Sequence, residues 1–164
     1  MYAEAMVPGA RYVHTNLVAR DWRRLADFYT HVFGCQPVPP ERDLAGRWLE
    51  ECTAVPGARI RGIHLRLPGG SGATLEIFQY DQKLEKPATA SNREGFAHIA
   101  FHVPDVEGAR REVIAAGGGE VGKLVATEVP GVGLLTVVYV TDPEGNIIEL
   151  QAWRDSKSGG THNE

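Results

Sequence analysis

The two halves of the sequence repeat one pattern of residues, and this repeat limits the folds open to the chain. Around His14, apolar and polar residues alternate as in a half-buried strand, and Asp21 then precedes a run with helical periodicity that stops at Gly34. A shift of 84 positions (98 − 14) carries these residues onto His98, Asp105 and Gly118. A strand, a helix cap and a helix-ending glycine that all coincide predict two copies of one module.

Each half also ends on a carboxylate between aliphatic residues. Leu75-Glu76-Ile77 corresponds to Ile148-Glu149-Leu150 with a shift of 73 positions (149 − 76). Strand-like alternation predicts a hairpin from residues 59–67 and 73–80 in the first half, and strands over 96–103, 134–141 and 147–153 in the second. A second helix is expected over 106–116. Each module therefore opens with a strand histidine and closes with a strand glutamate.

The stretch from Cys35 to Gly57 lacks a clear period. It contains four prolines, which predict irregular structure around a short helix over residues 44–52. We expect residues 1–10 to be a lead, 11–80 the first module, 81–95 a linker, 96–154 the second module and 155–164 a disordered tail.

Composition narrows the class of partner. The 164 residues include 17 basic and 21 acidic ones, with no basic block, which argues against nucleic acid or an acidic membrane and favours a small-molecule substrate. Two cysteines are too few for a disulfide framework. No signal pattern and no apolar run of about 18 residues is present, so we expect a cytoplasmic protein.

Four polar side chains are expected on the strand faces opposite the apolar ones. Two imidazoles and two carboxylates suit a divalent ion such as Zn²⁺, Ni²⁺, Co²⁺, Mn²⁺ or Fe²⁺. The candidate metal ligands are His14, Glu76, His98 and Glu149. His64 shares a polar strand face with Arg66, and we expect it to be an ordinary solvated side chain.

Each half has a strand histidine, an Asp-capped helix and a strand glutamate, and the second half ends on Asp142-Pro143-Glu144-Gly145-Asn146 followed by Glu149-Leu150. This pattern resembles that of the vicinal oxygen chelate superfamily. That superfamily includes glyoxalase I, methylmalonyl-CoA epimerase, extradiol dioxygenases and fosfomycin-resistance proteins. The resemblance covers Arg11 to Trp153 and implies an α+β fold. In it, two tandem βαβββ modules form curled mixed sheets around a central cleft that holds a metal.

The ligand pattern is most similar to glyoxalase I and the epimerases, in which all four positions bind the metal. This similarity implies a lyase or isomerase that stabilises an enolate, with Glu149 or Glu76 as the catalytic base. An extradiol Fe²⁺ dioxygenase would use His14, His98 and Glu149 only, and a drug-binding resistance protein would need no metal. The superfamily also implies a homodimer, with the site within one chain or across two. Substrate, metal and any use of glutathione or coenzyme A stay open.

Overall fold

The computed structural model describes residues 6–155 of the chain, which folds as two compact units, Met1–Glu85 and Lys86–Glu164. The expected tail, apart from Asp155, and the first half of the expected lead lie outside the described residues. Each unit has one sheet of mixed strand direction and a long helix, so the predicted α+β class is confirmed. No helix within residues 6–155 is long and apolar enough to cross a membrane.

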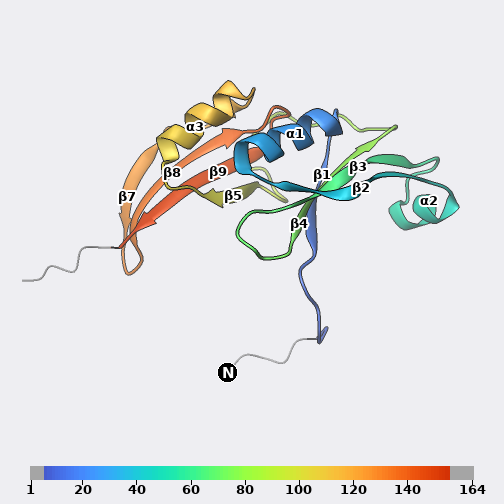
Figure 1. Ribbon diagram of the computed structural model, residues 1–164, viewed down its shortest axis with the longest axis horizontal. Helices are drawn as coiled ribbons and strands as arrows, with labels where there is room; N and C mark the ends of the chain where they lie inside the picture. The colour runs from blue at the N-terminus through green and yellow to red at the C-terminus, as the bar shows by residue number, and fades with distance from the viewer. Residues whose placement is uncertain (1–5, 156–164) are drawn as a thin grey trace, which may run out of the picture. The chain divides into compact units, whose positions relative to one another are not determined.

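The first unit contains β1 (His14–Val18), α1 (Trp22–Phe33), β2 (Gln36–Ala45), α2 (Arg47–Thr53), β3 (Arg59–Arg66) and β4 (Thr74–Tyr80) (Figure 1). Its sheet has the order β1-β4-β3-β2. The first strand pairs in parallel with the last, and the other pairs are antiparallel. The two ends of this unit's sequence are therefore neighbours in its sheet.

The second unit contains β5 (His98–His102), α3 (Val106–Ala115), β6 (Gly119–Glu120), β7 (Val125–Val129), β8 (Gly133–Thr141) and β9 (Ile147–Arg154). The order β5-β9-β8-β6 repeats that of the first sheet, and β7 also pairs with β8. Two short strands therefore take the place that β2 has in the first unit. The predicted duplication is thus present in strand order and in the parallel pairing of first and last strands.

Each long helix begins at the predicted aspartate. Asp21 accepts a hydrogen bond from the Arg24 backbone N–H at 3.2 Å, and Asp105 accepts one from the Gly108 N–H at 2.9 Å. Gly34 ends α1 with a left-handed φ of 68°. After α3 the left-handed residue is Gly117, with φ 96°, and not the predicted Gly118.

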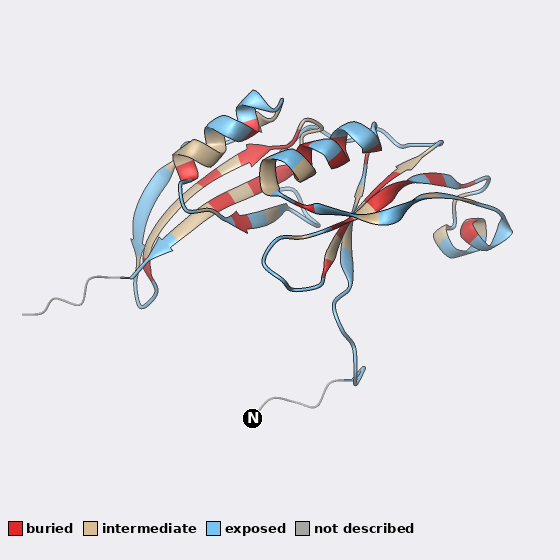
Figure 2. Cartoon of the chain, viewed as in Figure 1, coloured by how far each residue is buried: buried red, intermediate tan, exposed pale blue. Residues whose placement is uncertain are grey.

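The main core of each unit lies between its long helix and one face of its sheet (Figure 2). Because side chains alternate along a strand, the residues flanking each predicted glutamate point into this core. The fully buried members include Leu25, Tyr29, Leu65, Leu75 and Ile77 in the first unit and Val113, Val138, Val140, Ile148 and Leu150 in the second. Glu76 and Glu149 consequently lie on the opposite faces of their sheets.

The prediction for residues 35–57 was wrong about β2. A strand runs over Gln36–Ala45 even though it contains Pro37, Pro39 and Pro40. β2 is the edge strand of its sheet, and a proline whose nitrogen faces away from the sheet removes no hydrogen bond between strands. The pairing with β3 is also irregular, because its register shifts between Val38 and Arg42. The expected helix is present as α2 but begins three residues later, after the strand ends.

Candidate metal centre

In the first unit, the parallel pairing of β1 and β4 brings His14 close to Glu76. Asn16 lies opposite Glu76, so His14 is two residues away on the same face. The distance from His14 Nε2 to Glu76 Oε1 is 3.7 Å. Asn16 donates a hydrogen bond from Nδ2 to the same oxygen at 2.8 Å. Two of the four ligands predicted from the sequence therefore lie close together within this unit.

The solvated surface role expected for His64 is wrong. His64 lies directly opposite Glu76 across β3 and β4, and its Nε2 is 2.8 Å from Glu76 Oε2. Its Nδ1 shares a hydrogen bond of 2.9 Å with the hydroxyl of Thr74. Only 18% of the side chain is exposed. A hairpin centred on Gly70, within the predicted turn, pairs residue 64 with residue 76. The position of the turn in the sequence could therefore have identified His64 as a neighbour of Glu76.

The environment of His64 favours its neutral form. Burial lowers the pKa of His64 below its usual value, and the positive charge of Arg42 acts in the same direction, while the charge of Glu76 opposes both. A neutral imidazole has a free nitrogen lone pair, which is the form that binds metal ions.

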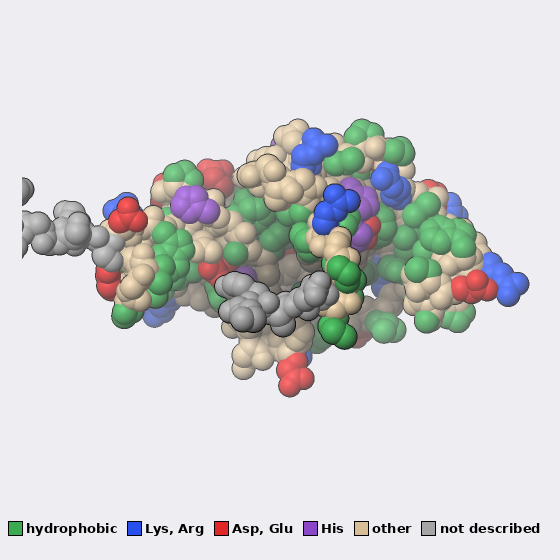
Figure 3. Space-filling view, turned by 90° about the horizontal axis from the view of Figure 1, so that it is seen from below, with side chains coloured by type: hydrophobic (Ala, Val, Ile, Leu, Met, Phe, Trp, Pro, Cys, Tyr) green, Lys and Arg blue, Asp and Glu red, His purple; other side chains and the backbone are tan. Residues whose placement is uncertain are grey.

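One side of this cluster is apolar. The ring of Phe78 meets His64 edge-on, with 5.9 Å between centroids, and also packs in a second small core with Leu49 of α2 and Ile60 of β3. Gly62 makes room for this ring, because a Cβ there would collide with Phe78 and with the Ile77 carbonyl oxygen. In Figure 3, histidine side chains reach the surface next to acidic ones, with hydrophobic side chains around them.

The second unit assembles the other predicted pair. Ala100 lies opposite Glu149 across β5 and β9, which again puts the strand histidine two residues away, and His98 Nε2 is 2.9 Å from Glu149 Oε2. Tyr139 lies opposite Glu149 on β8, and its ring is 5.0 Å from that of His98 between centroids. Burial, together with the charge of Glu149, raises the pKa of Tyr139.

The two sites correspond residue by residue, with three differences. The register positions of Asn16, His64 and Thr74 in the first unit are occupied by Ala100, Tyr139 and Ile147 in the second. Only the first unit, within the part of the chain that the structure describes, gathers three metal-type donors, and their atoms lie within 4.8 Å of one another. Two imidazoles and a carboxylate at such distances fit a divalent ion of intermediate hardness.

Comparison with protein-family models identifies the superfamily of the chain. Residues 11–150 match the model of the Glyoxalase/Bleomycin resistance protein/Dioxygenase superfamily. The chain therefore belongs to this superfamily, and the recognition made from the sequence is confirmed at that level. Members of the superfamily often bind a divalent metal, and many are enzymes. No curated protein matches the chain.

Several solved structures share the fold. A glyoxalase family protein from Bacillus cereus has a TM-score of 0.70 and 17% identity, over 92% of this chain and 97% of that one. The fosfomycin resistance protein FosX from Listeria monocytogenes has a TM-score of 0.54 and 16% identity, over 91% and 96% of the two chains. A glyoxylase/bleomycin resistance protein/dioxygenase domain from Frankia has a TM-score of 0.52 and 17% identity, over 90% and 93%. Such low identities establish the fold alone.

Proposed function

We propose that the protein is a divalent-metal-dependent enzyme of the lyase or isomerase type that acts on a small oxygenated substrate. Its metal ligands in this proposal are His14, Glu76, His98 and Glu149. The observation that supports it is the same histidine–glutamate pair at the same register position in both units.

The two glutamates differ in the role that we assign to them in the reaction. A bound divalent ion would supply Lewis-acid stabilisation of negative charge on substrate oxygens. A carboxylate is also needed to remove a proton from the neighbouring carbon. Both oxygens of Glu76 already have close partners in the first unit, since Oε1 accepts a hydrogen bond from Asn16 and Oε2 lies 2.8 Å from His64 Nε2. Glu149 has a smaller set of partners, so we assign the role of base to Glu149.

The first experiment is metal analysis of protein purified without added metal, with His98→Ala and Glu76→Ala beside it. The proposal predicts about one equivalent per chain in the wild type and loss of metal in both variants. If Glu76→Ala retains its metal and His98→Ala loses it, a three-ligand iron site of the dioxygenase type would be favoured. A wild type that binds no divalent ion after reconstitution would refute metal dependence and leave a metal-free drug-binding protein as the alternative.

The reaction type has its own test. We expect the metal-loaded protein in D₂O to exchange a carbon-bound proton in some member of a panel of small 2-oxo and 2-hydroxy acids and aldehydes, followed by proton NMR. The apoprotein and Glu149→Gln should not do so. Consumption of O₂ with a catechol would instead assign the protein to the dioxygenases.

We also propose a homodimer, for which light scattering should give twice the chain mass of 17.9 kDa.

A further inference from the structure

We propose that His64 is a third metal ligand within the first unit, so that this unit holds the ion through His14, His64 and Glu76. The inference rests on the proposed metal dependence. It adds to the four-residue set a ligand on β3, the first strand of the β3–β4 hairpin. It also predicts that the two units contribute unequally to metal affinity.

The distances among the donor atoms support this assignment. Ligand atoms that each lie about 2.0–2.1 Å from one ion are separated from each other by about 3–4 Å. Glu76 Oε2 is 2.8 Å from His64 Nε2, and Glu76 Oε1 is 3.7 Å from His14 Nε2. The two imidazole rings meet edge-on with 5.4 Å between centroids. Small side-chain rotations would therefore bring all three groups onto one ion.

The neighbours of these donors are those that ligating residues usually have. A histidine that binds a metal through one nitrogen typically has the other nitrogen hydrogen-bonded, and Thr74 fills this role for His64 Nδ1 at 2.9 Å. Asn16 likewise holds the carboxylate of Glu76 at 2.8 Å. These supports orient His64 Nε2 toward Glu76 before any ion binds.

The second unit serves as an internal comparison. It keeps the histidine–glutamate pair, but the positions equivalent to His64 and Thr74 are Tyr139 and Ile147. A hairpin histidine with its own hydroxyl partner is therefore not a requirement of the fold. Two imidazoles and one carboxylate favour Zn²⁺, Co²⁺ or Ni²⁺ over Mg²⁺ or Ca²⁺.

The test is binding of Zn²⁺ and Co²⁺ to the full-length apoprotein, by competition with a chromophoric chelator, in wild type, His64→Gln and His31→Gln. His31 is an exposed histidine on α1 whose Nδ1 contacts the Asp27 carbonyl, and it serves as the matched control. We expect His64→Gln to weaken binding about 100-fold or more, since changes to outer-shell partners alone cost 10–100-fold. His31→Gln should bind as wild type does.

A Co²⁺ spectrum separates a ligand from a residue that only orients Glu76. Loss of an imidazole ligand should change the visible bands in His64→Gln, whereas Thr74→Val should weaken binding and leave the bands in place. An affinity within threefold of wild type, or an unchanged spectrum in His64→Gln and in His64→Asn, would overturn the inference. If metal binding then still depends on His98, the proposed function survives; if the wild type binds no metal, both fail.

Discussion

Asp142 anchors the turn between β8 and β9, and its replacement should be among the most damaging changes outside the metal centre. The side chain is 1% exposed. Its Oδ1 accepts the backbone N–H groups of Glu144 at 2.9 Å and Asn146 at 3.0 Å, and its Oδ2 accepts the Asn146 side-chain amide at 2.7 Å. Three hydrogen bonds to one carboxylate thus fix the backbone that leads into the strand of Glu149.

The expected cost follows from these bonds. Asp142→Ala leaves three donors without their acceptor, and hydrogen bonds to a charged group contribute about 1.5–3 kcal/mol each. Water that enters the space left by the side chain can replace part of this, so we expect a loss of about 3–5 kcal/mol in the free energy of unfolding. Asp142→Asn keeps an oxygen for the two backbone N–H groups and should cost only about 1–2 kcal/mol.

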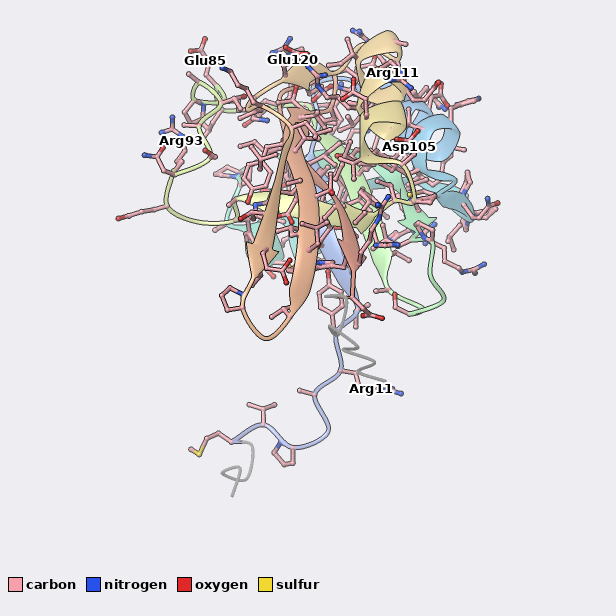
Figure 4. All side chains as sticks on the ribbon, turned by 90° about the vertical axis from the view of Figure 1, so that its left-hand side faces the viewer. Arg11, Glu85, Arg93, Asp105, Arg111 and Glu120 are labelled. Carbon is pink, nitrogen blue, oxygen red and sulfur yellow. The ribbon has the colours of Figure 1, made fainter. Side chains whose placement is uncertain are left out.

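The assay is urea unfolding of wild type, Asp142→Ala, Asp142→Asn and Asp105→Ala. Asp105 stands at the start of α3 (Figure 4), where its exposed side chain caps the helix. Loss of such a cap costs about 1 kcal/mol, which provides the reference. The reasoning would be refuted if Asp142→Ala cost no more than Asp105→Ala, or if Ala and Asn at position 142 were equally destabilising.

Three further predictions concern the first unit. Burial raises the pKa of the Cys35 thiol from 9.0 to about 11, so the native state binds more protons than the unfolded state between these values. Stability should therefore fall by about 2 kcal/mol as the pH rises from 9 to 11, relative to a Cys35→Ala variant in the same urea titration. At pH 8 only the exposed Cys52 should react rapidly with a thiol reagent, and a second fast thiol in the native protein would contradict the burial of Cys35. Gly62→Ala should displace Phe78 from His64 and lower Tm by several degrees, and an unchanged Tm would refute the close approach described for Gly62.

Local signals in the sequence predicted much of this fold. Asp21 and Gly34 bound the first helix because capping depends only on neighbouring backbone groups. The alternation around Glu76 and Glu149 placed both carboxylates on the faces opposite the cores. These features need no knowledge of what lies across the sheet. The duplication predicted a histidine and a glutamate in each half, whereas their closeness comes from the parallel pairing of first and last strands.

The failures have a different origin. The prolines of β2 were interpreted as strand breakers, yet their effect depends on whether the strand is central or at an edge, which is a property of the whole sheet. The solvated role expected for His64 rests on its neighbours in the sequence, whereas its contact with Glu76 follows from the register of a hairpin that pairs residues twelve positions apart (76 − 64). Both errors concern pairing between strands, which neighbouring residues alone do not reveal.

The parallel pairing of first and last strands has a consequence for how each unit holds together. In the first unit the histidine and the glutamate lie on β1 and β4, at opposite ends of its sequence, and the same holds for β5 and β9. Closing this seam brings together residues about fifty to sixty positions apart, which is entropically costly. A ligand held by such a pair binds only when the two strands are paired. Its binding therefore raises the free energy of unfolding of that unit.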